Sequence, residues 1–126
     1  TYQTVYYTGD AEIGMTISIH AIGEAKNISI FNTVTRESMR IDTDKLAQIT
    51  GSGVIAGDDI IICTVKRNKT IYLLRNGVYI NILNCLDRDA DWFQLSKGDN
   101  LFAYTVEEGL ENLQFRIENR TIFEGV

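Results

Sequence analysis

Hydrophobic and polar residues alternate with a period of two along much of the chain. Apolar residues occupy every second position in three segments, residues 15–21, 38–42 and 113–118. Because successive side chains of a β-strand point to opposite faces, this alternation predicts strands with one face in a core and the other in water. The segments Ile60–Val65 and Leu101–Val106 are apolar at consecutive positions, which predicts strands buried on both faces.

Turn residues separate these segments and predict a hairpin near the middle of the chain. Asn76 and Gly77 lie between two apolar runs, Ile71–Leu74 and Val78–Leu83. Both residues tolerate a positive φ, so we expect a two-residue turn here. The segment Tyr2–Tyr7 is also strand-like, and glycine-containing breaks separate the remaining runs.

The expected fold is a single all-β domain over residues 1–126. About eight to ten short strands with turns between them are typical of an antiparallel β-sandwich or barrel. No long helical pattern is present, and we expect at most one or two short helical turns, at Asp44–Ile49 and at Leu86–Phe93. A chain of 126 residues is long enough to bury a core of its own.

Composition and charge exclude several classes of protein. The chain carries 12 Lys and Arg against 17 Asp and Glu, a formal net charge of -5, so it lacks the basic surface that nucleic acid or anionic membranes require. No apolar run approaches the roughly 20 residues of a membrane span. Proline is absent, and Lys66, Arg67, Lys69 and Arg75 are the residues expected to protect exposed strand edges.

The two cysteines do not form a disulfide framework. Cys63 lies in an apolar run and Cys85 follows Leu83 and Asn84, so we expect two buried thiols, with a bridge as the alternative. The chain begins without Met in a strand-like stretch. This start predicts a domain cut from a longer protein, or a processed or engineered start.

Residues that could carry catalysis are few. His20 is the only histidine and lies on the polar side of its alternating segment, where a surface role is expected. Gly51-Ser52-Gly53 lacks the spacing of a nucleophile elbow and predicts a flexible loop. We therefore expect no catalytic residues, no cofactor and no enzyme activity.

Two further groups of residues allow a binding interpretation. Asp87, Asp89 and Asp91 have the spacing of calcium ligands, but Trp92 and Gly98 stand where a calcium loop needs Gly and Glu. We expect an acidic turn instead, with Asp87 as a helix cap. Trp92 is expected to close one end of the core, although a sugar-stacking role is the alternative.

The order of several short motifs resembles one known family. They include Gly57-Asp58-Asp59 before a buried strand, Asn76-Gly77, Asp91-Trp92-Phe93, and an Asn-x-x-Thr-x-Glu-x-Met pattern from Asn32 to Met39. Tyr7-Thr8-Gly9-Asp10 precedes the first alternating strand, and Phe123-Glu124-Gly125-Val126 ends the chain. Together they resemble the C-terminal domain of the distal tail protein of siphophages and prophages.

This resemblance implies a galectin-like, jelly-roll-like β-sandwich with a structural role in a phage tail. Family members have an N-terminal belt domain that closes a hexameric ring, and the C-terminal sandwich lies outside the ring. The implied partners are the tail tube, the tail hub and receptor-binding proteins, in a virion tail assembled in the bacterial cytoplasm. Without the belt this fragment is expected to be monomeric.

Two other functions remain as alternatives. A carbohydrate-binding module for bacterial cell-wall saccharides would use Trp92, Tyr72, Tyr79 and Tyr104 as stacking platforms. The sugar-reading signatures of galectins are absent, however, because Ala21 and Ile22 follow His20, and Phe93, Gln94 and Leu95 follow Trp92. A shared fold does not carry function with it. A hydrolase using Asp89 and Asp91 has the weakest support, since carboxylates two residues apart are close in any chain.

Overall fold

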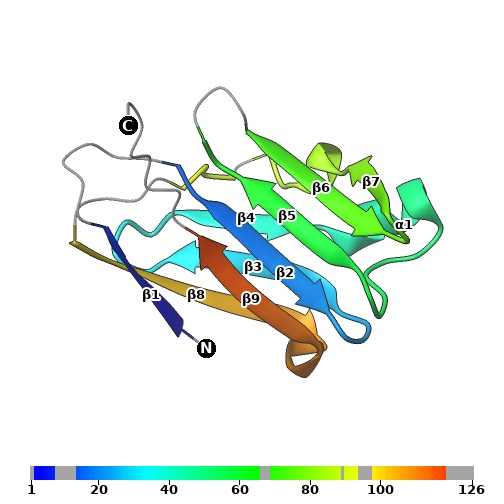
Figure 1. The fold of residues 1–126 in the computed structure, drawn as a ribbon, viewed down its shortest axis with the longest axis horizontal. Helices are drawn as coiled ribbons and strands as arrows, with labels where there is room; N and C mark the ends of the chain where they lie inside the picture. The colour runs from blue at the N-terminus through cyan, green and yellow to red at the C-terminus, as the bar shows by residue number, and fades with distance from the viewer. Residues whose placement is uncertain (1, 8–13, 66–68, 89, 94–97, 119–126) are drawn as a thin grey trace.

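The computed structural model describes residues 2–7, 14–65, 69–88, 90–93 and 98–118. It contains two antiparallel sheets that pack face to face, one short α-helix and two 3-10 turns (Figure 1). The elements in chain order are β1 (Tyr2–Tyr7), β2 (Thr16–Ala21), β3 (Lys26–Asn32), β4 (Ser38–Ile41), α1 (Thr43–Thr50), β5 (Asp59–Cys63), β6 (Thr70–Arg75), β7 (Val78–Asn81), η1 (Leu83–Cys85), β8 (Gly98–Glu108), η2 (Leu110–Asn112) and β9 (Leu113–Glu118). The predicted all-β sandwich is confirmed.

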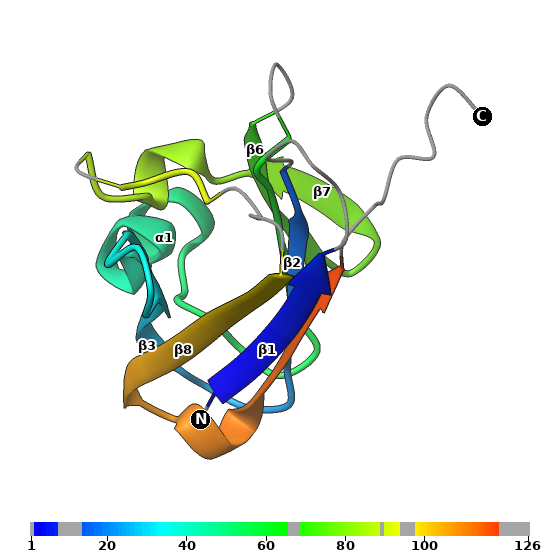
Figure 2. The same cartoon turned by 90° about the vertical axis from the view of Figure 1, so that its left-hand side faces the viewer.

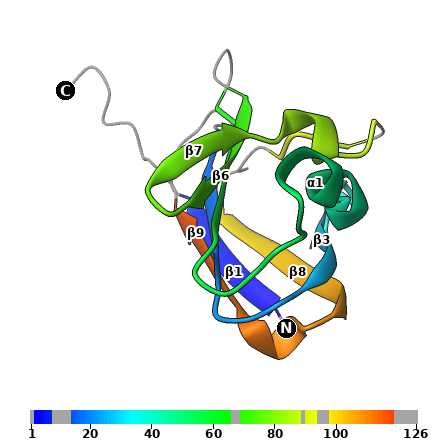
Figure 3. The same ribbon diagram turned by 90° about the vertical axis from the view of Figure 1, so that its right-hand side faces the viewer.

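The two sheets have different strand orders. One has four strands in the order β1-β8-β3-β4, and the other has five in the order β7-β6-β5-β2-β9. Strands β1 and β9 lie on the same side of the sandwich, whereas α1 lies on the opposite side, against β3 (Figures 2 and 3). The chain therefore passes repeatedly between the layers, as it does from β2 to β3 and from β4 to β5.

The core is formed by the inward positions that the alternation predicts. Ile17 of β2 lies opposite Ile62 and Ile117, and Ile19 lies opposite Ile60 and Phe115. Ile17, Ile19, Ile60 and Ile62 are fully buried. Each such side chain stabilises the fold by about 1.5–3 kcal/mol relative to exposure. The period of two thus places one complete set of apolar residues between the sheets.

The prediction that β5 and β8 are buried on both faces is wrong. Ile60 and Ile62 of β5 are buried, but Ile61 and Cys63 on the outer face are only half-buried. In β8, Phe102 is buried while Leu101 and Ala103 are half-exposed. The physical reason is that no second layer covers the outer face of an antiparallel sandwich.

The β6–β7 hairpin forms as predicted. Arg75 lies opposite Val78, and Asn76 and Gly77 adopt positive φ values of 52° and 77°. These two left-handed residues are typical of a type I′ turn, whose twist matches that of the flanking strands.

Helix α1 confirms one of the two predicted helical turns. The Asp42 side chain accepts hydrogen bonds from the backbone N–H groups of Asp44 and Lys45, which caps the helix start. Gly51, with φ of 87°, ends the helix by donating its N–H to the Ala47 carbonyl.

No helix forms in the described part of the second predicted segment, Leu86–Phe93, where one turn is closed by the Ala90 N–H, which donates to the Asp87 carbonyl at 3.1 Å. Leu86 is extended, and residues on both sides of the turn bind β4. Leu86 bridges Ile41, and the N–H groups of Asp87 and Asp91 donate to the carbonyls of Arg40 and Ser38. Asp87 consequently caps no helix, and its carboxylate lies 3.4 Å from Arg40 Nη1. Pairing with an edge strand has overridden a weak local helical preference.

Arg75 does not protect a strand edge, contrary to expectation. Its side chain is turned inward and only 13% exposed, and it binds Asp58. Lys66 and Arg67 lie outside the described residues, and Lys69 is exposed. Both cysteines are free thiols. The expected burial is confirmed for Cys85, which is fully buried, and is wrong for Cys63, which is half-buried on the outer face of β5.

Candidate interaction sites

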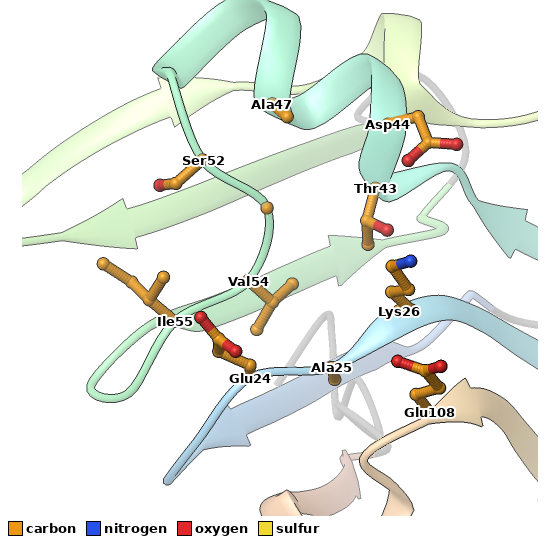
Figure 4. A pocket seen from close by; sticks show the side chains of 11 residues that line it. Glu24, Ala25, Lys26, Thr43, Asp44, Ala47, Ser52, Val54, Ile55 and Glu108 are labelled. Carbon is orange, nitrogen blue, oxygen red and sulfur yellow. The ribbon is translucent and has the colours of Figure 1, made fainter.

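The first candidate site is a pocket of about 290 Å³ between α1 and the adjoining ends of two strands (Figure 4). Four separate segments form it: the start of β3, the first turns of α1, the loop after α1 and the end of β8. The lining residues are Glu24, Ala25, Lys26, Thr43, Asp44, Ala47, Ser52, Gly53, Val54, Ile55 and Glu108.

Hydrogen bonds between β3 and α1 fix one side of this pocket. The Asn27 Oδ1 atom accepts from the Thr43 N–H at 3.1 Å, and the Asn27 N–H donates to Thr43 Oγ1 at 3.2 Å. Asn27 has a positive φ of 48°, which asparagine adopts more readily than most residues. An isolated bridge between Ala25 and Val54 holds the opposite loop against the same strand.

A buried ion pair anchors the loop that follows α1. Arg75 donates from Nε and Nη2 to the two oxygens of Asp58 at 2.8 and 2.6 Å. Its Nη1 and Nη2 also donate to Ser52 Oγ at 3.0 Å and to the Gly53 carbonyl at 2.8 Å. Hydrogen bonding to Asp58 raises the pKa of Arg75, although burial opposes this. The predicted glycine-rich loop is therefore tied to β6 at Ser52 and Gly53.

The pocket combines charged side chains with apolar ones. Its rim carries the carboxylates of Glu24, Asp44 and Glu108 beside the Lys26 ammonium, and its inner wall includes Ala25 and Val54. The Ser52 hydroxyl accepts a hydrogen bond from Arg75, and no histidine or cysteine is among the residues that line the pocket.

The second candidate site is a more open hollow of about 490 Å³ around Trp92. It is lined by Lys45, Leu83, Asn84, Leu86, Asp87, Arg88 and Trp92. Trp92 is half-buried and packs against the core, and the Lys69 ammonium lies 5.8 Å from the centre of its ring. The expectation that Trp92 contributes to the core is confirmed, but one part of the indole also borders this hollow.

His20 is paired with a carboxylate on the outer face of the five-stranded sheet. Its Nδ1 atom lies 2.7 Å from Asp59 Oδ1, and the two residues are directly opposite in β2 and β5. Their side chains are 44% and 36% exposed, as expected of a surface histidine. Neither residue lines the two pockets described above.

The three tyrosines considered as stacking platforms lie in different surroundings. Tyr104 lies between the sheets, stacked on Phe115 with ring centres 3.6 Å apart, and burial raises its pKa. It is therefore unsuited to stack on a sugar. Tyr72 and Tyr79 lie on the outer face of the five-stranded sheet, edge to face with ring centres 6.2 Å apart. Such a pair does not offer two coplanar faces to neighbouring sugar rings.

The acidic turn makes structural contacts. Asp91 Oδ2 accepts from the Ser38 N–H at 3.0 Å, Asp87 pairs with Arg40, and Asp89 lies outside the described residues. Within the described part of the chain, no group of three or more His, Cys, Asp or Glu side chains is arranged to hold a metal ion. No helix in that part is long and apolar enough to cross a membrane.

The structure is thus a two-layer antiparallel β-sandwich with two surface pockets among the residues described. Comparison with protein families identifies the family to which this sandwich belongs. Residues 8–119 match the family model described as siphovirus-type tail component, C-terminal domain, and the chain belongs to this family. Neither the curated proteins nor the solved structures gave a match. The matched range includes the motifs from Gly9 to Trp92, whereas Phe123–Val126 lies beyond it.

The sequence did not predict either pocket. The first draws on four segments far apart in the chain, and none of its lining residues forms a recognisable motif. One local signal existed: Asp42 is a residue type preferred at a helix N-cap, and it stands directly before the segment that forms α1. The position of α1 over β3 depends on tertiary packing.

Proposed function

We propose that this domain is a non-catalytic structural module of a phage or prophage tail tip. It is the C-terminal domain of a distal tail protein, and it takes part in baseplate assembly and in the attachment of receptor-binding proteins or contact with the host surface. The observation that carries this proposal is the family match, which spans most of the sandwich.

The surface of the domain supports a binding role. Its pockets combine charged rims with small apolar walls, as surfaces for protein contacts do. A net charge of -5 also suits a domain outside the tail tube, because it does not retain passing DNA by counterion release. In this account the ring is formed by an upstream belt domain, and residues 1–126 alone are monomeric.

Extension of the chain upstream tests the proposal. The full-length protein is expected to form a hexameric ring, measured by light scattering after gel filtration, while residues 1–126 remain monomeric. The full-length protein should also be present in purified particles. A full-length protein that stays monomeric at high concentration and is absent from particles would contradict the proposal.

A second candidate function, recognition of a bacterial cell-wall saccharide, is favoured by the hollow around Trp92. An indole beside Asn84, Asp87, Arg88 and Lys45 combines a stacking surface with donors and acceptors for hydroxyl groups. Lys69 lies over the indole ring, so a saccharide must displace it or use another part of the ring.

Glycan-array binding of the wild type and of Trp92→Ala tests this second function. Binding to wall polysaccharides that Trp92→Ala abolishes is the expected result. Tyr79→Ala is the matched control, because Tyr79 is an exposed aromatic residue that does not line this hollow. This function would be ruled out if the wild type bound no glycan, or if Trp92→Ala and Tyr79→Ala lost glycan binding equally.

A further inference from the structure

Strand β7 is an edge strand whose outward backbone groups are free within the described part of the chain. It pairs with β6 through a two-residue turn, so Val78 and Ile80 direct their N–H and C=O groups toward β6. The Ile82 N–H continues this pattern by donating to the Ile71 carbonyl at 3.0 Å. The backbone groups of Tyr79 and Asn81 therefore point away from the sheet, and no described residue pairs with them.

Strand β4 of the opposite sheet shows one way in which an outermost strand of this fold is covered. Strand β4 is also outermost in its sheet, but the segment beside it covers its free side. The Asp42 N–H donates to the Cys85 carbonyl at 2.8 Å, and Asp87 and Asp91 donate to the Arg40 and Ser38 carbonyls at 3.0 and 2.8 Å. Strand β7 has no such cover among the described residues, and Figure 3 shows it at the outside of its sheet.

The side chains of β7 also lack the usual devices that prevent edge pairing. Proteins commonly place charged residues or proline on a free edge. The sequence of β7, Val-Tyr-Ile-Asn, contains neither. Val78 is 59% exposed, Tyr79 62% and the neighbouring Leu83 41%, so an apolar surface flanks the free backbone groups.

We infer that β7 is the docking edge for an extended, uncharged segment of another tail protein, which adds to the five-stranded sheet as its next strand. This inference rests on the proposed function. Free N–H and C=O groups two residues apart match the repeat of a strand, and the neutral apolar flanks favour β-branched or aromatic side chains in the partner.

A second copy of this chain is a poorer occupant of the edge. Only Tyr79 and Asn81 offer outward backbone groups, and self-pairing over four residues falls well short of the roughly 1,200 Å² of a stable interface. Each copy also carries a net charge of -5. A segment of another protein that the assembly already holds nearby can bind through a small contact area, because tethering raises its effective concentration. An uncharged segment is also not repelled by the net charge of the domain.

Hydrogen–deuterium exchange of the full-length protein, free and in purified tail particles, tests the inference. The amides of Tyr79 and Asn81 are expected to exchange at least about tenfold more slowly in particles, which corresponds to about 1.4 kcal/mol of protection. Equal exchange in both states, with the protein present in particles, would overturn this inference and leave the proposed function intact. Absence of the wild-type protein from particles would overturn both. Protection already present in the free chain at high concentration would indicate self-pairing and overturn the inference.

A matched pair of variants gives a second readout. Asn81→Pro removes the outward N–H, whereas Asn81→Ala keeps it, and both lose the hydrogen bond from the Leu83 N–H to Asn81 Oδ1. Incorporation into particles is expected to fall at least about tenfold for Asn81→Pro relative to Asn81→Ala. Equal incorporation of the two variants would contradict the inference. If Asn81→Pro does not fold, the exchange measurement on the wild type decides.

Discussion

Arg75, the last residue of β6, and Asp58, which directly precedes β5, form a two-point ion pair with N–O distances of 2.8 and 2.6 Å. The Asp58 side chain is 1% exposed and also accepts the Ile55 N–H at 2.9 Å. Through Ser52 and Gly53, the same arginine holds the loop that forms one wall of the first pocket. The pair thus couples the stability of the fold to the shape of a candidate binding site.

Replacement of this arginine should be costly. Arg75→Met leaves the Asp58 carboxylate buried without its counter-charge, and about 3–5 kcal/mol of unfolding free energy should be lost. Arg40→Met is the matched control, because Arg40 and Asp87 are about 40% exposed and 3.4 Å apart, and its cost should be at most about 1 kcal/mol. Urea unfolding of both variants measures the difference, and similar losses would refute the structural role of Arg75.

Two glycines with similar φ values should differ in their tolerance of a side chain. Gly109 has φ of 88°, and a β-carbon there would collide with the Glu24 carbonyl oxygen, whereas Gly77 has φ of 77° and open space around it. Gly77→Ala should cost about 1 kcal/mol from backbone strain alone. Gly109→Ala adds the collision and should cost about 3 kcal/mol or more, measured as unfolding free energy. Equal losses of unfolding free energy in the two variants would show that the Glu24 carbonyl oxygen does not lie this close to Gly109.

Stability should fall at high pH because of Tyr104. Burial raises its pKa above the ordinary value of about 10, so the folded state keeps a proton that the unfolded state releases. The stabilisation that Tyr104 contributes to the folded state is therefore complete below about pH 10. It is lost as the pH rises through the raised pKa of the folded protein. Tyr104→Phe keeps the stacked ring and removes this dependence. Plots of unfolding free energy against pH should run parallel for the wild type and Tyr104→Phe up to about pH 9 and diverge above about pH 10. Plots that stay parallel over the whole range would contradict the burial of Tyr104.

The two thiols should react at different rates. Burial, with a further contribution from Asp42 that Lys45 opposes, raises the pKa of Cys85, whereas Cys63 is half-buried on the outer face of β5. Because the thiolate is the reactive form, Cys63 should react with Ellman's reagent first and Cys85 only as the chain unfolds. Cys63→Ser should therefore retain only the slow phase. Two fast thiols in the native protein would show that Cys85 is accessible.

Strand positions could be predicted from the sequence because alternation of side chains is a local property. The segment 15–21, the Asn76-Gly77 turn and the strand at 113–118 each form where the pattern predicts them. Two failures have tertiary causes. The segment from Leu86 onward pairs with β4, and Arg75 turns inward to meet Asp58, which lies 17 residues earlier in the chain. Neither partner is visible from local propensity.

The candidate sites could be predicted less well than the fold. Trp92 was singled out from the sequence, but the neighbours that make a hollow around it come from α1 and from residues 83–88. The first pocket has no sequence motif at all, and the free edge of β7 becomes evident only once the strand order is known. Family membership, by contrast, was predicted from the order of motifs along the chain, and the family match over residues 8–119 confirms it.

The most direct test of the account is a cryo-EM map of purified tails, combined with mass spectrometry of the same particles. The account predicts peptides of this chain in the particle and density for a two-layer sandwich at the tail tip, outside the wall of the tube. Particles that contain no peptide of this chain, or that hold the sandwich inside the tube, would contradict it.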